Sequence, residues 1–218
     1  MTTKYKLAVF DVNIVLIKSH SITDLADIIG TKPQVERYIQ GHTSGLLSMS
    51  QALEEACKHL KGLKRSQAIE HARNMEIMDG AQEMVKALRK ENITLGIITT
   101  GFTLTMNILN QRLGHAFKYV ICNDLVFKDN VATGEIRFSV RENEMKAEIL
   151  RDLAKKEGVD MSQTIAVGDS MGDQNMLDAA GLGIAFNPNE ALINYASKHG
   201  IALVKKPDLR GIIPLIVS

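Results

Sequence analysis

Acidic, amide, hydroxyl and glycine residues follow three apolar runs of the chain, at the points where a buried strand would end. Each run is short and continuous, as expected of strands covered on both faces of a parallel sheet. The residues are Asp11 and Asn13 after the run at 6–10, Thr99, Thr100 and Gly101 after the run at 93–98, and Gly168, Asp169 and Asp173 after the run at 164–167. Because ligands of open parallel sheets bind at the carboxyl ends of the strands, we expect these side chains to share one site.

These residue types indicate the chemistry of phosphoryl groups. Carboxylates without histidine or cysteine partners are hard oxygen ligands, and they suit Mg²⁺ bound together with a substrate phosphate. Residues 99–101 precede an expected helix, whose N-terminal N–H groups would bind an anion. Lys146, early in a later helix, would add a positive charge. An aspartate in such a site can attack phosphorus and form an aspartyl-phosphate.

Each feature alone also has an ordinary structural interpretation. A single aspartate after a strand commonly forms a turn or a helix N-cap, and Thr-Thr-Gly is a turn signal. A lysine on a helix, such as Lys146, is usually solvated. The functional interpretation rests on four features in one order, each after an expected strand or on the helix next to it.

Strand and helix patterns alternate along the chain, which predicts an α/β fold: a Rossmann-like parallel sheet with helices on both faces. The segments 126–130 and 136–140 flank a turn and predict a small β-hairpin. The further strand patterns lie at 119–122, 183–186 and 201–204, and the helical patterns at 81–90, 102–113, 145–157, 174–180 and 189–199.

A helical block at 19–78 interrupts this alternation directly after the first strand. Its apolar residues recur at helical spacing, and glycine and proline divide it into three or four helices. We therefore expect an inserted helical cap at 17–78 and a core made of 1–16 and 79–218.

The composition argues against nucleic acid and membrane partners. The 218 residues include 26 basic and 25 acidic side chains, so a net charge of +1 provides no strong field for polyanions. Segment 92–111 has no charged residue, but its five threonines and its Thr-Thr-Gly sequence favour a buried strand, a turn and a helix over a membrane span. Two cysteines without C-x-x-C spacing, Cys57 and Cys122, indicate buried thiols in a reducing cytoplasm.

Four motifs together resemble those of the haloacid dehalogenase superfamily and, within it, the phosphoserine phosphatases. They are Phe10-Asp11-Val12-Asn13, Thr99-Thr100-Gly101-Phe102, Lys146 and Gly168-Asp169-Ser170-Met171-Gly172-Asp173. The resemblance covers nearly the whole chain, including the helical block and the hairpin. It implies a Mg²⁺-dependent phosphomonoester phosphatase that acts on a small phosphorylated metabolite, as a monomer or homodimer.

The resemblance also implies a role for each matching residue. Asp11 would be the nucleophile, and the helical insert would be a mobile cap that excludes water from the substrate. Mg²⁺ would be held by Asp11, Asp169 and the backbone carbonyl of Asn13, with Asp173 orienting its water ligands. The phosphate would be held by Thr99, the backbone N–H of Thr100, Gly101 and Lys146.

The chain departs from the family pattern at Asn13, where the family has a second aspartate that acts as general acid and base. An amide cannot transfer that proton, and a general acid–base is worth about 10²–10⁴-fold in rate. Three explanations remain open: an engineered substitution that traps a ligand, a naturally slow phosphatase, or a protein that binds phosphoryl groups without turnover. The alternative function is therefore a catalytically weakened phosphoryl-binding or regulatory module of the same fold.

Further departures affect the substrate. Thr100 adds bulk where the family has glycine, and Gly172 replaces a usual asparagine, with the loss of one contact. His20 and Ala56 take the places of a glutamate and an arginine that hold the amino and carboxylate groups of phosphoserine. His20 is a candidate substrate contact or an ordinary surface histidine, and the loss of the charged pair argues against phosphoserine as the natural substrate.

Overall fold

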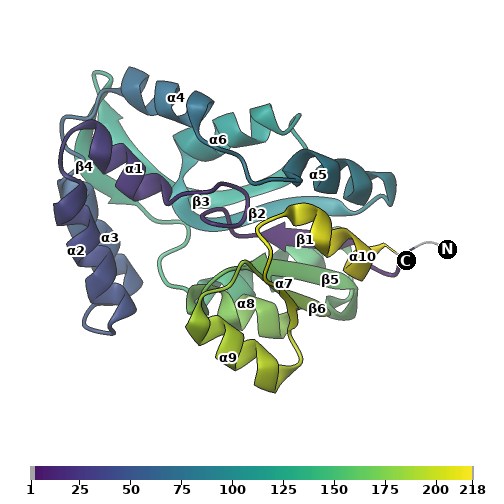
Figure 1. Ribbon diagram of the computed structural model, residues 1–218. Helices are drawn as coiled ribbons and strands as arrows, with labels where there is room; N and C mark the ends of the chain where they lie inside the picture. Colours follow the sequence, from purple (N-terminus) through teal and green to yellow (C-terminus); the bar gives the residue numbers. More distant parts are fainter. Residues whose placement is uncertain (1–2, 218) are drawn as a thin grey trace.

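The computed structural model describes residues 3–217 and contains a seven-stranded sheet in the order β4-β3-β2-β1-β5-β6-β7 (Figure 1). All neighbouring strands are parallel except β4, which pairs antiparallel with β3 at one edge. This sheet confirms the predicted α/β fold. The strands span Leu7–Phe10 (β1), Thr94–Phe102 (β2), Phe117–Lys128 (β3), Val131–Arg137 (β4), Thr164–Gly168 (β5), Leu182–Phe186 (β6) and Ala202–Val204 (β7).

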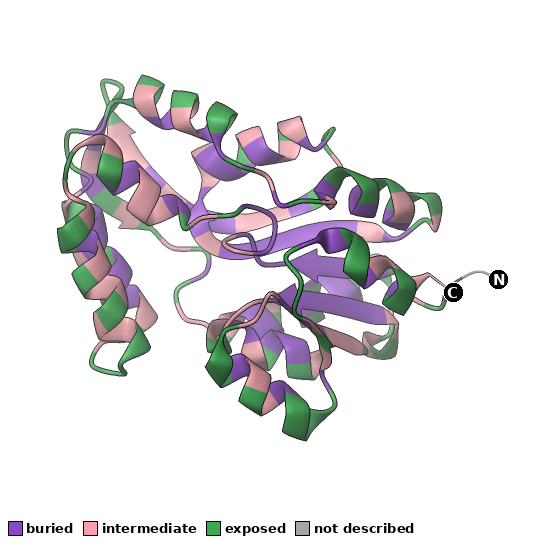
Figure 2. Cartoon of the chain, viewed as in Figure 1, coloured by how far each residue is buried: buried purple, intermediate pink, exposed green. Residues whose placement is uncertain are grey.

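Helices cover both faces of the sheet, because successive side chains of a strand point to opposite faces. On β1, Ala8 and Phe10 pack with α5, α6 and α10, whereas Leu7 and Val9 pack with α7, α8 and α9. These four side chains are fully buried, and Figure 2 shows the central strands as a continuous buried layer. The α-helices span Ser21–Ile28 (α1), Lys32–Thr43 (α2), Met49–Lys58 (α3), Arg65–Asn74 (α4), Ala81–Lys90 (α5), Thr103–Arg112 (α6), Met145–Glu157 (α7), Gln174–Ala179 (α8), Glu190–His199 (α9) and Ile213–Ile216 (α10).

The prediction of a turn at 99–101 was wrong. Strand β2 continues through these residues to Phe102, and α6 begins at the next residue. The pairing with β3 shifts its register between Ile98 and Phe102, so that Phe102 pairs with Asn123. Thr99 and Thr100 therefore lie on an irregular strand end and not on the first turn of a helix.

The predicted hairpin is confirmed, with different limits. Strand β3 is one element of 12 residues, because its first half pairs with β2 and its second half with β4. The turn lies at Asp129 and Asn130, whose φ angles of 50° and 63° are the left-handed values that a tight hairpin turn requires. Strand β4 consequently covers 131–137 and not 136–140.

Helices α1 to α4 lie between β1 and α5 in the chain, where the helical block was expected. Leu25, Ala56 and Leu60 of this block share a hydrophobic cluster with Leu125 and Ala132 of the hairpin. The hairpin thus packs with the helical block, and the division into a core and a cap stays a prediction. Within residues 3–217, the structure has no helix that is both long and apolar enough to cross a bilayer.

Candidate active site

Lys146, the second residue of α7, lies between two buried carboxylates. Its Nζ is 2.9 Å from Asp11 Oδ1 and 2.7 Å from Asp173 Oδ1. Lys146, Asp11 and Asp173 are 4%, 5% and 1% exposed, so this lysine is not the solvated helix residue that lysines usually are. A buried charge is tolerated when it is paired and hydrogen-bonded, and here the ammonium has two anionic acceptors.

Strand ends and backbone N–H groups hold these carboxylates in place. Asp11 directly follows β1, and its N–H donates to the carbonyl of Val167 on the neighbouring β5 at 2.9 Å. Asp173 Oδ2 accepts from the N–H groups of Asp169 at 3.1 Å and Ser170 at 3.4 Å. Both oxygens of Asp173 are thus engaged, whereas the second oxygen of Asp11 lies outside the ion pair with Lys146.

Burial and neighbouring charges change the pKa values of the residues in this cluster. Burial, together with the negative charges of Asp173 and Asp11, raises the pKa of Asp169 to about 8, against the attraction of Lys146. Burial also raises the pKa of Asp11, against the attraction of Lys146. For Lys146, burial disfavours the charged form, but Asp11 and Asp173 outweigh it and hold its pKa above the ordinary value. Without a cation, the site therefore resists the ionisation of Asp11 and Asp169.

The three aspartates fit a divalent cation. One carboxylate oxygen from each of Asp11, Asp169 and Asp173 lies within 4.8 Å of the others. With all three ionised, these carboxylates and one ammonium carry a formal charge of −2, which a dication would balance. The donors are all oxygens, which favours Mg²⁺ over metals that prefer nitrogen or sulfur.

The end of β2 lies at the same edge of the sheet, since Phe10 of β1 pairs with Ile97. Thr99 is fully buried, and its hydroxyl accepts from the N–H of Gly101 at 3.3 Å. The Thr100 carbonyl accepts from the amide of Asn123 at 3.1 Å. Backbone and side-chain contacts thus fix the strand end that the resemblance assigns to phosphate binding.

Asn13 forms a hydrogen bond with the helical block. Its Oδ1 accepts from the backbone N–H of Ser21 at 2.9 Å, which satisfies one of the unpaired N–H groups at the start of α1. The next residue, Ile14, has φ 62°, an unusual left-handed conformation for a β-branched side chain. Strained backbone of this kind clusters at functional sites. The side chain of Asn13 is therefore held at the junction of β1 and the helical block.

Within residues 3–217, neither His20 nor Ala56 makes a polar contact with the acidic cluster. His20 is exposed at the N-terminus of α1, and within residues 3–217 its side chain makes no hydrogen bond or ion pair. Ala56 is fully buried in the cluster beneath α3. Gly172 lies against Asn143, because a Cβ at this glycine would be 3.3 Å from the Asn143 amide. Asn143 thus lies next to Gly172, the position at which the phosphoserine phosphatases usually have an asparagine.

Sequence patterns did not reveal Asn123, which is fully buried and uses its whole amide. Its Nδ2 donates to the carbonyls of Thr100 and Val140, and its Oδ1 accepts from the N–H groups of Ser139 and Val140. One signal was present, since this amide follows the apolar strand pattern at 119–122. Asn123 joins the end of β2 to the segment that leads into α7.

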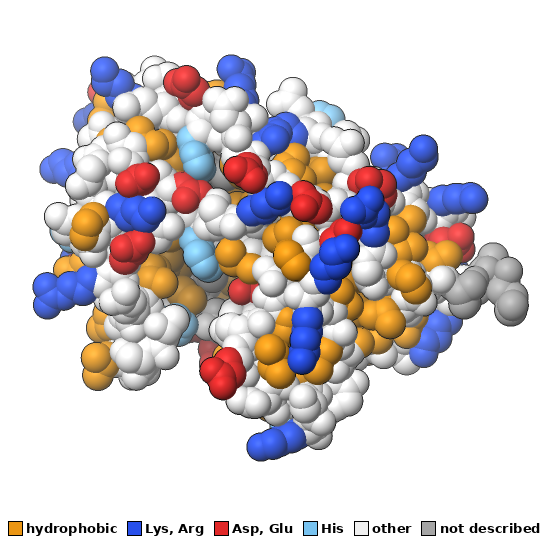
Figure 3. Space-filling view, viewed as in Figure 1, with side chains coloured by type: hydrophobic (Ala, Val, Ile, Leu, Met, Phe, Trp, Pro, Cys, Tyr) orange, Lys and Arg blue, Asp and Glu red, His pale blue; other side chains and the backbone are white. Residues whose placement is uncertain are grey.

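The space-filling view shows a hollow between the helical block and the part of the molecule that contains α8 and α9 (Figure 3). Acidic and histidine side chains gather around this hollow. The carboxyl end of β1 points toward it from the sheet (Figure 1).

The sheet, with its acidic cluster beyond β1 and β5, defines a class of hydrolase. Residues 8–178 match the family model of the haloacid dehalogenase-like hydrolases, and the chain belongs to this family. Within the family it is a phosphoserine phosphatase-like hydrolase, as its relatives and structural neighbours show.

The phosphoserine phosphatase of Methanocaldococcus jannaschii is 30% identical over 99% of this chain and 100% of its own length. That of Archaeoglobus fulgidus is 31% identical over 88% of this chain, which spans only 55% of that protein. A solved structure described as a phospho-aspartyl intermediate analogue of phosphoserine phosphatase has a TM-score of 0.88 and 30% identity, covering 97% of this chain and 99% of its own.

Proposed function

We propose that this protein is a Mg²⁺-dependent phosphomonoester phosphatase that works through an aspartyl-phosphate on Asp11. The observation that carries the proposal is the buried Lys146, which holds one oxygen of Asp11 and one of Asp173 at hydrogen-bond distance. The phospho-aspartyl analogue of a structural neighbour supports the same chemistry. Asp11, Asp169 and the backbone carbonyl of Asn13 would hold Mg²⁺, which would offset negative charge on the phosphoryl oxygens.

The reaction has two steps, and with Asn13 in place of an acid the leaving alkoxide takes its proton from solvent. A carboxylate oxygen of Asp11 attacks phosphorus, an O–P bond forms, and the bond between phosphorus and the leaving alcohol oxygen breaks. Lys146, the Thr99 hydroxyl and the backbone N–H of Thr100 stabilise charge on the transferring group. Water then attacks phosphorus, and the O–P bond to Asp11 breaks. The Asp11 carboxylate is regenerated, and the protons of the water leave with the inorganic phosphate or go to solvent.

Asn13 slows each step that requires a proton transfer. The leaving oxygen needs a proton, and the attacking water must lose one, but an amide can only hydrogen-bond. Substrates with a good leaving group need no proton in the first step. We therefore infer fast phosphorylation of Asp11 by such esters, followed by slow hydrolysis. The alternative, a phosphoryl-binding or regulatory module, is favoured by this same residue.

We infer a substrate among small phosphorylated metabolites other than phosphoserine, the compound named for the relatives. The exposed His20 could contact such a substrate when the helical block moves, but Ala56 offers no charge. The buried thiols Cys57 and Cys122 fit a cytoplasmic protein. We expect a monomer or homodimer.

The test is hydrolysis of p-nitrophenyl phosphate with Mg²⁺ or with a chelator. The variants are Asp11→Asn and, as a matched control, Asp152→Asn, which changes an exposed carboxylate on α7. We expect Mg²⁺-dependent hydrolysis that Asp11→Asn abolishes and Asp152→Asn retains. Absence of hydrolysis by both the chain and its Asn13→Asp variant would contradict the proposal.

A further inference from the structure

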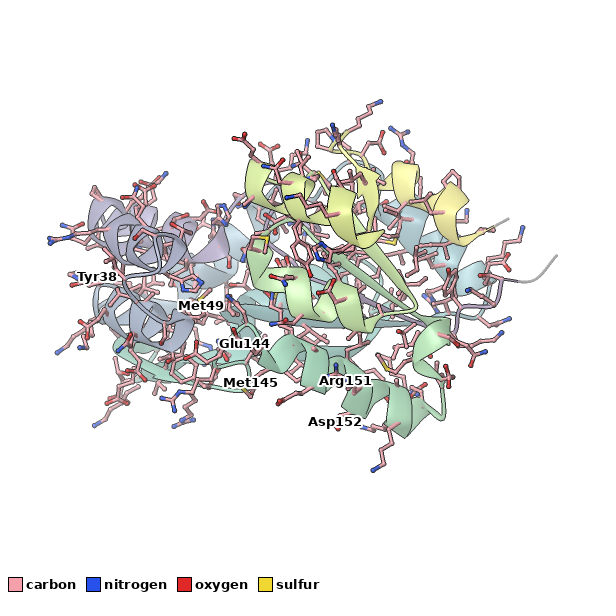
Figure 4. The ribbon with its side chains drawn as sticks, turned by 90° about the horizontal axis from the view of Figure 1, so that it is seen from below. Tyr38, Met49, Glu144, Met145, Arg151 and Asp152 are labelled. Carbon is pink, nitrogen blue, oxygen red and sulfur yellow. The ribbon has the colours of Figure 1, made fainter. Side chains whose placement is uncertain are left out.

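Three successive residues before α7 bind the helical block with their side chains. Arg141 pairs with Glu54 at 3.0 Å, the Glu142 carboxylate accepts from the start of α3, and the Asn143 amide lies 3.2 Å from His42 Nε2. Seen from below, the start of α3 at Met49 lies beside the start of α7 at Glu144 and Met145 (Figure 4). We call residues 141–143 the strap.

Glu142 completes the N-terminus of α3. Its carboxylate accepts from the backbone N–H groups of Met49 at 3.1 Å and Ser50 at 3.3 Å, and from the hydroxyls of Ser48 and Ser50. The next N–H, of Gln51, donates to the Ser48 hydroxyl. A carboxylate at a helix N-terminus also interacts favourably with the helix dipole. Glu142 is thus the strap residue with the most contacts to the helical block.

Asn143 links the helical block to the acidic cluster. His42 Nδ1 lies 3.2 Å from the carbonyl of Leu47 and must donate to it, so that Nε2 accepts from Asn143 Nδ2. The same amide lies against Gly172, next to the cluster residue Asp173. A movement of α2 would therefore be transmitted to the turn that holds Asp173.

The backbone of the strap begins the helix that carries the buried lysine. The N–H of Met145 donates to the Glu142 carbonyl at 3.2 Å, and the N–H of Lys146 donates to the Asn143 carbonyl at 3.1 Å. Lys146 in turn binds Asp11 and Asp173. The residues that contact α2 and α3 with their side chains therefore fix the first turn of α7 with their carbonyls.

We propose that Glu142 is a positioning residue, which fastens α3 through the strap and thereby sets Lys146 against Asp11 and Asp173. The helical block and the phosphate-binding lysine then move as one unit, so that the lysine is correctly placed only when α3 is docked. This proposal rests on the proposed function for its effect on phosphate, but its structural part stands on the contacts above.

A purely local role is the competing explanation, in which Glu142 only stabilises α3. The free energy of unfolding of a Glu142 variant does not by itself distinguish the two roles. Energetic coupling between Glu142 and Lys146 does distinguish them. The variants are Glu142→Ala, Glu142→Gln and Lys146→Met, with Glu144→Ala as the control. Glu144 is exposed and its side chain does not cap α7.

The first measurement is binding of inorganic phosphate in the presence of Mg²⁺, followed by calorimetry. We expect Glu142→Ala to weaken binding at least tenfold and Glu144→Ala to leave it unchanged. Glu142→Gln keeps an acceptor oxygen without the charge, so it should fall between them. Unchanged phosphate affinity in a folded Glu142→Ala protein would overturn the proposal.

The second measurement is independent of activity and of phosphate. It is a double-mutant cycle between Glu142→Ala and Lys146→Met on urea unfolding, with Glu142→Gln in place of the alanine variant if that variant does not fold. We expect non-additive effects and faster hydrogen exchange in the first turns of both α3 and α7. Additive effects, or faster exchange in α3 alone, would overturn the proposal. If the unchanged protein does not bind phosphate, the proposed function fails, and the cycle alone decides the role of Glu142.

Discussion

Asn13 Oδ1 accepts a hydrogen bond from the backbone N–H of Ser21 at 2.9 Å, which joins the residue two positions after the proposed nucleophile to the first turn of α1. An aspartate carboxylate has the same shape and accepts the same N–H. The site can therefore take either side chain without a change of fold, and the two differ in the proton that only aspartate can transfer.

Asn13→Asp should increase steady-state hydrolysis of phosphomonoesters by about 10²–10⁴-fold, the usual effect of a general acid–base. The gain should be largest for esters with poor leaving groups, which need protonation most. Steady-state kinetics with a series of aryl and alkyl phosphates measures it. A variant no faster than the unchanged chain on every ester would show that Asn13 does not limit turnover.

Lys146→Met should destabilise the metal-free protein by about 3–5 kcal/mol, because the change removes one partner of a buried ion network and leaves carboxylates unpaired. Urea unfolding in the presence of a chelator measures the loss. Lys155→Met, an exposed change on the same helix, should have little effect. Equal stability of the two variants would mean that the ion pairs contribute nothing to folding.

Mg²⁺ should stabilise the protein more at high pH. Burial and the charges of Asp173 and Asp11 raise the pKa of Asp169 to about 8, whereas an unfolded aspartate titrates at about 3.9. The stability that this group contributes is fully present below the lower pKa and is lost as pH rises through the higher one. A bound dication favours the ionised carboxylate, so its stabilising effect grows over the same window.

Melting temperatures with Mg²⁺ and with chelator, at about pH 6 and about pH 9, measure this difference. Asp169→Asn removes the titrating group. Without metal, the melting temperature of this variant should therefore fall less from the lower to the higher pH than that of the unchanged protein. A Mg²⁺ effect that is equal at both pH values would argue against Asp169 as a ligand.

The sequence predicted most of the sheet and its helices because their signals are local. Helices 81–90 and 145–157 match α5 and α7 residue for residue, since apolar periodicity and flanking glycines mark both. The turn expected at 99–101 failed because pairing with β3 extends β2 beyond the apolar run, and pairing partners are not visible in a local pattern.

The acidic cluster could be predicted because each of its residues follows a strand or begins a helix. Asn123, Glu142 and Asn143 could not, because their roles depend on contacts with segments far along the chain. Glu142, for example, binds Met49, 93 residues away. In the sequence this glutamate is one of 25 acidic residues and has no distinguishing neighbour.

Rapid mixing with p-nitrophenyl phosphate and Mg²⁺ shows whether Asp11 becomes phosphorylated. Since p-nitrophenolate leaves without a proton and Asn13 cannot activate water, we predict a burst of one product per chain followed by slow turnover. Mass spectrometry of the quenched protein should find one phosphoryl group on the peptide that contains Asp11, and Asn13→Asp should remove the burst by speeding hydrolysis. A quenched protein without a phosphoryl group at Asp11, or with one on another residue, would rule out Asp11 as the nucleophile.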